Sequence, residues 1–238
     1  MRLPLSLLAS VLFVAGCSRQ PSSKPPAPTA YGTQIVEVSG GKQLAAVGSA
    51  PTQPVVVQVN GSDGNPVTGA LVIFHGEGLH FTPEQALSDS SGQATTSPQL
   101  GFNAGDYQIT AETPKKEGGS ASVNLRQTAL GYEATLGKAV NDQYCIRCHD
   151  SESTPERVSN LDNLSPAPHQ FSDGATYNRL QDSDITNIIS HGGLALSKSP
   201  QMPAYGATLK PAEIKAVLAY IRAVADPPYQ TPGVKYGK

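Results

Sequence analysis

The chain has 238 residues and a formal net charge of −2; 38% of the residues are hydrophobic and 6% aromatic, with 23 glycines, 20 prolines and no tryptophan. This length gives room for two modest domains, and the composition is typical of turn-rich β structure beside a small domain whose core a cofactor completes. At a net charge of −2, no excess of basic residues argues for nucleic-acid binding, so we expect no nucleic-acid partner.

The first residues have the pattern of a secretory signal peptide, which we assign to 1–16. Arg2 gives a positively charged start, and the apolar run at 5–15 is too short to span a bilayer. Residues 14–17 (Val-Ala-Gly-Cys) resemble the bacterial lipobox, which implies that Cys17 is lipid-modified and anchors an exported protein to a membrane, facing the periplasm. Ser18 is not acidic, which favours the outer membrane. The alternative is a soluble secreted protein with Cys17 as a spare thiol.

Residues 17–33 follow as a lipidated linker rich in proline and serine. They contain almost no large apolar side chain for a core, so we expect a semi-rigid tether that holds the folded part away from the membrane. At the other end, the tail at 227–238 begins with two prolines and is expected to be flexible.

Residues 34–128 combine short strands with dense turns. Apolar residues alternate in four segments: Val55, Val57 and Val59; Ala70, Val72 and Phe74; Tyr107, Ile109 and Ala111; Ala121, Val123 and Leu125. Strands of this kind at regular spacing predict an antiparallel β-sandwich. The sequence at 63–70, 89–94 and 104–107 resembles bacterial Ig-like modules, which implies an all-β Ig-like domain with Tyr107 as its corner tyrosine.

An Ig-like fold does not by itself indicate a function, and we expect a spacer or a docking platform rather than a catalyst. His75 and His80 lie in this region. Since no second cluster of ligands accompanies them, we interpret both as ordinary surface or packed histidines.

The most specific motif is Cys-Ile-Arg-Cys-His at 145–149, the pattern of covalent c-type haem attachment. Cysteines three residues apart lie on one face of a helical turn, so Cys145 and Cys148 can each reach one vinyl group of the same porphyrin. His149 then lies beneath the iron as its proximal ligand. The alternatives are a chance pentapeptide, a thioredoxin-like motif or a zinc site, although zinc would need further ligands at matching spacing. The chain has three cysteines, and this assignment leaves none for a disulfide.

Residues 129–226 have a helical pattern. We predict helices at 132–144, leading into the haem motif, at 182–190, which Gly192 stops, and at 211–224. The last is the clearest, with Pro211 in its first turn and one apolar stripe made by Ile214, Val217, Leu218, Ile221 and Val224.

Met202 is the predicted second axial ligand of the iron. The chain has two methionines, and Met1 leaves with the signal peptide. Pro203 favours extended backbone at Met202, in a loop that can offer sulfur from the distal side. A core-filling methionine is the alternative, although it would lie more naturally in a helix stripe. His169 and His191 are the rival distal ligands.

In this order, the haem motif, the middle helix, the Met202 loop and the terminal helix resemble a class I monohaem cytochrome c. The resemblance covers 129–226 and implies one covalent haem c. Gly137 matches the small residue at which the first helix of that family crosses the last, with Tyr220 as the aromatic partner. Asn141 departs from the aromatic residue usual four positions before the first haem cysteine.

The same resemblance implies that a proline carbonyl orients the proximal histidine. Pro166 and Pro168 are the candidates in this sequence.

The sequence thus predicts a multidomain protein, an N-terminal all-β Ig-like sandwich plus a C-terminal all-α cytochrome c domain. With both axial positions filled, the iron has no position for substrate, so we expect an electron carrier and not an enzyme. Its partners would be a redox protein donor and acceptor, whose identity the sequence does not reveal. The alternatives are an adhesive or scaffolding lipoprotein with a redox module, and a cytochrome subunit of a periplasmic dehydrogenase complex.

Overall fold

The computed structural model describes residues 26–150 and 158–231. The predicted signal peptide at 1–16, Cys17 and the first part of the linker lie outside the described residues, as does the end of the tail. Within the described ranges, no helix is long and apolar enough to cross a membrane.

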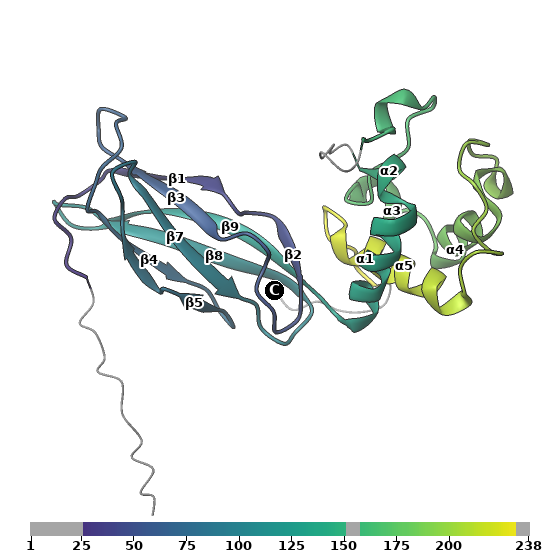
Figure 1. The fold of residues 1–238 in the computed structure, drawn as a ribbon, viewed down its shortest axis with the longest axis horizontal. Helices are drawn as coiled ribbons and strands as arrows, with labels where there is room; N and C mark the ends of the chain where they lie inside the picture. The colour runs from purple at the N-terminus through teal and green to yellow at the C-terminus, as the bar shows by residue number, and fades with distance from the viewer. Residues whose placement is uncertain (1–25, 151–157, 232–238) are drawn as a thin grey trace, which may run out of the picture.

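The N-terminal half is a β-sandwich, which confirms the predicted fold of this region (Figure 1). One sheet has the strand order β1-β3-β7-β5 and the other β2-β9-β8-β4-β6. The strands are β1 Gln34–Ser39, β2 Gln43–Ala46, β3 Val55–Asn60, β4 Leu71–His75, β5 His80–Thr82, β6 Gln85–Leu87, β7 Gln93–Gln99, β8 Gly105–Pro114 and β9 Ser120–Leu130.

One pairing differs from the antiparallel arrangement that we predicted, because β2 runs parallel to β9. The reason lies in the connection between β1 and β2. Gly40 and Lys42 have φ values of 85° and 56°, and the chain passes here from one sheet to the other. As the chain changes sheets without a hairpin, β2 does not pair with β1 and lies at the edge beside β9.

The four alternating segments predicted as strands are β3, β4, β8 and β9, and their inward side chains form the core of the sandwich. This core includes Val55, Val57, Val59, Ala70, Val72, Phe74, Ile109, Ala111 and Leu125. The hydroxyl of Tyr107 donates a hydrogen bond to the carbonyl oxygen of Asn103, 3.0 Å away and four residues upstream. This contact is that of a corner tyrosine, and Tyr107 lies near the start of β8.

The C-terminal half is helical, as predicted (Figure 1). Its helices are α1 Tyr132–Tyr144, α2 Ile146–His149, α3 Gly174–Tyr177, α4 Asp182–His191 and α5 Pro211–Val224, with 3-10 turns η1 Leu161–Asn163 and η2 Gly193–Leu196. The helices α1 and α5 have the predicted bounds, and α4 extends one residue beyond its predicted end. The short α2, α3, η1 and η2 were not predicted, because a helix of one turn has no apolar periodicity to detect.

The helix α5 shows why the sequence folds this way. Pro211 is its first residue, where the missing N–H costs nothing. The Glu213 carboxylate accepts a hydrogen bond of 2.7 Å from the backbone N–H of Lys210 and caps the first turn. Ile214, Val217 and Ile221 are buried in the core of the helical half.

Gly137 lies where α1 crosses α5. A Cβ atom at this position would overlap the carbonyl oxygen of Ala216 and come within 2.9 Å of the Cβ atom of Tyr220. The predicted role of Gly137 at the helix crossing, with Tyr220 as its partner, is therefore confirmed.

We expect Gly137→Ala to lower the free energy of unfolding by about 1–3 kcal/mol, the usual cost of overpacking a core. The control is Ala139→Gly on the exposed face of the same helix, where the loss of alanine costs about 1 kcal/mol through helix propensity. The more stable protein would thus have glycine at position 137 and alanine at position 139. Chemical unfolding followed by circular dichroism measures both, and a Gly137→Ala protein as stable as the wild type would contradict the crossing.

The two halves are in contact. The strand β9 continues to Leu130, past the boundary predicted after residue 128, and Gly131 alone separates it from α1. Leu130 is buried in the helical core, and Leu44 of β2 packs against the same cluster. Arg126 of β9 forms an ion pair of 3.0 Å with Asp226, just beyond α5. The sandwich therefore packs against the helical half through β2 and β9.

Candidate haem-binding site

The residues of the Cys-x-x-Cys-His motif lie in one continuous turn after α1. The backbone N–H of Cys145 donates to Asn141 at 2.9 Å, and those of Cys148 and His149 donate to the carbonyl oxygen of Cys145 at 3.0 and 3.1 Å. Both thiols are free. Burial, and secondarily the neighbouring Cys148, raises the pKa of the Cys145 thiol to about 11. The turn thus presents two free thiols at the spacing that two thioether bonds to one porphyrin require.

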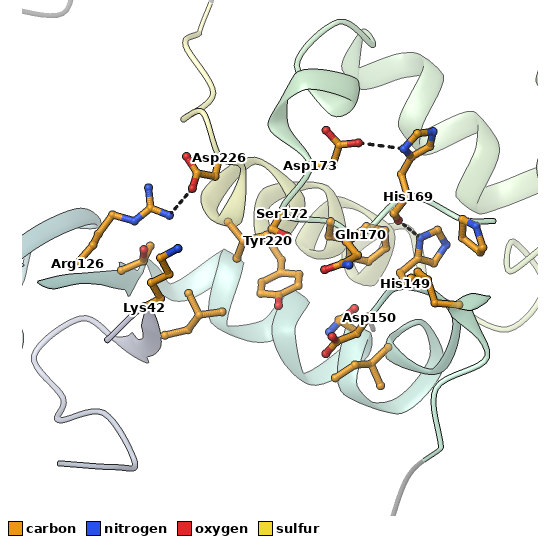
Figure 2. Close-up of a pocket in the computed structure, with 18 residues that line it drawn as sticks. Lys42, Arg126, His149, Asp150, His169, Gln170, Ser172, Asp173, Tyr220 and Asp226 are labelled. Atoms are coloured by element: carbon orange, nitrogen blue, oxygen red, sulfur yellow. Dashed lines mark hydrogen bonds and ion pairs between the residues drawn. The ribbon is translucent and has the colours of Figure 1, made fainter. Parts of the chain in front are cut away.

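A hydrogen bond at one ring nitrogen fixes the imidazole of His149. Its Nδ1 lies 2.7 Å from the carbonyl oxygen of His169 (Figure 2). Since a carbonyl oxygen only accepts, Nδ1 carries the proton and Nε2 keeps a lone pair for a metal. Burial lowers the pKa of His149, which favours the neutral imidazole that can bind iron. The donor set of two thiols and one oriented imidazole therefore fits a c-type haem.

The prediction of a proline carbonyl behind His149 was wrong. The acceptor belongs to His169, the residue after Pro168. The two predicted candidates, Pro166 and Pro168, therefore do not supply the carbonyl oxygen that accepts from Nδ1 of His149. No side-chain pattern in the sequence marks this acceptor, because any residue supplies a backbone carbonyl.

Two aromatic residues that the sequence did not reveal complete the surroundings of His149. The Phe171 ring stacks on the imidazole, with ring centroids 4.5 Å apart and an interplanar angle of 19°. Tyr177 meets the edge of Phe171 at 5.6 Å, and its hydroxyl donates to the carbonyl oxygen of His169 at 3.2 Å. Burial raises the pKa of Tyr177 above its ordinary value. These contacts fix the plane and the direction of the imidazole.

The loop that carries Met202 is fixed at both ends. The carbonyl oxygen of Met202 accepts a hydrogen bond of 3.0 Å from the backbone N–H of Gly193, the first residue of η2. Three residues further on, the Tyr205 hydroxyl donates to the carbonyl oxygen of Tyr144 at 3.1 Å, next to the first haem cysteine. The fold thus ties the Met202 loop to the start of the haem motif, and iron ligation by Met202 stays a prediction.

The two rival histidines have other partners. Nδ1 of His169 lies at hydrogen-bond distance, 2.9 Å, from the Asp173 carboxylate, and the His169 side chain is 60% exposed. Its carbonyl oxygen lies at Nδ1 of His149, the side opposite Nε2, so the geometry disfavours His169 as the distal ligand. Nδ1 of His191 is 2.7 Å from the side-chain oxygen of Asn187 at the exposed end of α4.

A cavity of about 750 Å³ lies between the two halves, and His149 is one of the residues that line it (Figure 2). Lys42 and Arg126 line it from the sandwich, and Asn141 and Tyr220 line it from α1 and α5. Neither haem cysteine nor Met202 is part of its lining. Asn141 is buried, and an aromatic side chain in its place would extend into this space. Asparagine at position 141, in place of the aromatic residue usual there, therefore leaves room at the junction of the two halves.

The histidines of the sandwich lie away from this site. His75 is exposed and pairs with Glu112 at 3.5 Å, and His80 is exposed on β5. Among residues 26–150 and 158–231, no group of three or more His, Cys, Asp or Glu side chains is arranged to hold a metal ion.

The helical half has the parts of a c-type cytochrome domain: a Cys-x-x-Cys-His turn, an oriented histidine and a first helix that crosses the last. Residues 133–221 match the family model described as "Cytochrome C oxidase, cbb3-type, subunit III", and the match does not extend into the sandwich. This part of the chain is a cytochrome c domain similar to that subunit, which implies covalently bound haem c. This similarity indicates a role in electron transfer, as a carrier or as a redox subunit, in an exported protein. Among curated proteins, no sequence matches the chain.

Several solved structures are similar to parts of the chain, including those of an intimin fragment, invasin and WR4. The D00-D0 domain of intimin has 17% identity and a TM-score of 0.30, covering 42% of this chain and 49% of that one. Invasin, described as a bacterial integrin-binding protein, has 21% identity and a TM-score of 0.32, covering 44% and 21%. WR4, a C. elegans MSP family member, has 8% identity and a TM-score of 0.29, covering 37% and 91%. The chain thus covers about half of the intimin fragment. Similarity this weak carries no argument about function, and the sandwich is assigned from its own strands.

Proposed function

We propose that the protein is a monohaem c-type cytochrome that carries single electrons between redox proteins. Cys145 and Cys148 would hold the haem covalently, and His149 and Met202 would be its axial ligands. The bound haem supplies an iron that changes between Fe(II) and Fe(III). The observation that carries the proposal is the hydrogen bond of 2.7 Å from His149 Nδ1 to the carbonyl oxygen of His169, which leaves Nε2 for iron in the same turn as the two free thiols.

Met202 as the distal ligand is supported by its loop, which is tied to both α4 and Tyr144. Two protein ligands would leave the iron without a position for substrate, and this favours an electron carrier over an enzyme. His/Met ligation raises the reduction potential, so the donor and acceptor would belong to a high-potential chain.

The experiment that tests electron transfer is visible spectroscopy of the purified holoprotein at a series of applied potentials. We expect one reversible transition that fits a single electron, because the sequence contains one Cys-x-x-Cys-His motif. A haem spectrum that does not change reversibly with potential would contradict the proposal.

We also propose that Cys17 is lipid-modified and anchors the protein to a membrane, facing the periplasm, with the outer membrane favoured by Ser18. Residues 17–33 would be the linker that leads from this anchor to the sandwich. The sandwich would then act as a rigid stand for the haem domain, since Leu130 and the Arg126–Asp226 pair join the two halves.

Replacing Cys17 with serine should release the protein from the membrane into the soluble periplasmic fraction, because the lipid-bearing sulfur is removed. Haem attachment should not change, since Cys145 and Cys148 are intact. Fractionation followed by haem staining measures both properties. Membrane association that persists in Cys17→Ser would show that another part of the protein binds the membrane.

A second candidate function is a cytochrome subunit of a larger oxidoreductase complex. The name of the matched family, which is that of an oxidase subunit, favours this candidate. The two functions differ in the state of the native protein. A carrier would be extracted from membranes as a separate species, and a subunit would copurify with catalytic subunits at a fixed ratio.

A further inference from the structure

The carbonyl oxygen of His169 accepts two hydrogen bonds. Nδ1–H of His149 donates to it at 2.7 Å, and the hydroxyl of Tyr177 donates to it at 3.2 Å. The hydroxyl oxygen of Tyr177 is also 3.4 Å from Nδ1 itself. Tyr177 therefore lies against the one backbone group that sets the direction of the proximal imidazole.

Two donors on one carbonyl oxygen weaken each other. The oxygen has two lone pairs and can accept both bonds, but each donor withdraws electron density that the other would use. A hydrogen bond from the free nitrogen of a metal-binding histidine makes that histidine a more basic ligand. A weaker bond at Nδ1 therefore leaves the imidazole a poorer electron donor, which favours Fe(II) over Fe(III).

Tyr177 is fixed in this position from several sides. It ends α3, whose first turn is capped by the Asp173 carboxylate through a bond of 3.1 Å from the N–H of Thr176. Its ring meets the edge of Phe171, and its carbonyl oxygen accepts a bond of 2.7 Å from Arg222 of α5. The side chain is buried. The hydroxyl is thus held against the carbonyl oxygen by the fold of α3 and α5.

We propose that Tyr177 is a positioning residue that raises the reduction potential of the haem by sharing the His169 carbonyl with His149. This inference rests on the proposed haem ligation by His149. It assigns to α3 a part in redox tuning, in addition to its part in packing.

The test is Tyr177→Phe in the full-length holoprotein, because phenylalanine keeps the ring and removes the hydroxyl. We expect the equilibrium to shift about threefold toward Fe(III), which is roughly 28 mV lower in potential because tenfold corresponds to 59 mV for one electron. The Nδ1 proton of His149 in the reduced protein should move downfield in the NMR spectrum as its hydrogen bond strengthens. The ferric absorption that reports the distal ligand should not change.

The matched control is Tyr220→Phe. Tyr220 meets the edge of Phe171 at 6.5 Å, in the same aromatic cluster, and is not a partner of the His169 carbonyl in the described contacts. The reduction potential of the Tyr220→Phe protein should equal that of the wild type. If Tyr177 had only a packing role, Tyr177→Phe would leave the reduction potential and the Nδ1 resonance unchanged. If only the polarity of the hydroxyl group mattered, its removal would raise the reduction potential. Either result would overturn the proposal.

A failure of the proposed function is distinguishable from a failure of this inference. Wild-type protein without covalent haem or without a one-electron transition would remove the function itself. A normal wild-type titration together with an unshifted Tyr177→Phe would remove only the role of Tyr177.

Discussion

A variant with Cys145→Ala and Cys148→Ala is expected to lose all covalently bound haem. The thioether bonds need both sulfurs, and alanine offers no atom that can add to a vinyl group. After denaturing electrophoresis, the wild-type band should keep the peroxidase activity of haem and the variant band should have none. Each single variant should keep one thioether bond and an intermediate amount of haem.

Cys17→Ser is the matched control, because it removes the one cysteine outside the haem motif and leaves that motif intact. It should stain for haem as strongly as the wild type. Haem that separates from the wild-type protein on denaturation would overturn covalent attachment, and so would haem that stays bound to the double variant. The result concerns attachment alone and does not depend on which residue is the distal ligand.

Met202→Ala is expected to open the distal position of the iron. The oxidised wild-type protein should show the weak red absorption of ferric iron bound to a thioether sulfur, and the variant should lack it. Exogenous ligands such as cyanide or carbon monoxide should then bind readily, and the potential should fall. Met202→His should restore a six-coordinate iron at a lower potential than the wild type, because imidazole stabilises Fe(III) more than thioether sulfur does.

His169→Ala and His191→Ala are the controls for this assignment. His169→Ala keeps the backbone carbonyl that accepts from His149, so it tests the imidazole alone. Both variants should retain the red absorption and resist exogenous ligands. If either lost the absorption while Met202→Ala kept it, the distal ligand would be that histidine and the case for a high-potential carrier would weaken.

The strand β3, which the sequence predicted, and the strand β7, which it did not, differ in one physical respect. In β3, alternate valines face the core, and their apolar character made the period visible. In β7, the buried positions include Ala94, Thr96 and Pro98, and Thr96 satisfies its hydroxyl by donating to the carbonyl oxygen of Pro83 at 2.7 Å. A strand whose inward face is small or polar has no apolar alternation, so only the tertiary structure reveals it.

The sequence by itself determined the chemistry of this protein. The cysteine spacing and the adjacent histidine are properties of residue type and order, and haem attachment depends on them directly. The helices α1 and α5 were equally determined, because their apolar periodicity and the proline at the start of α5 are local features of the sequence.

The tertiary structure decided which groups orient the imidazole of His149. The acceptor for His149 is a backbone oxygen twenty residues away, shared with a tyrosine from α3, and the sandwich reaches the helical core through Leu130. A backbone carbonyl has no identity in the sequence, so only the path of the chain can bring it to the imidazole.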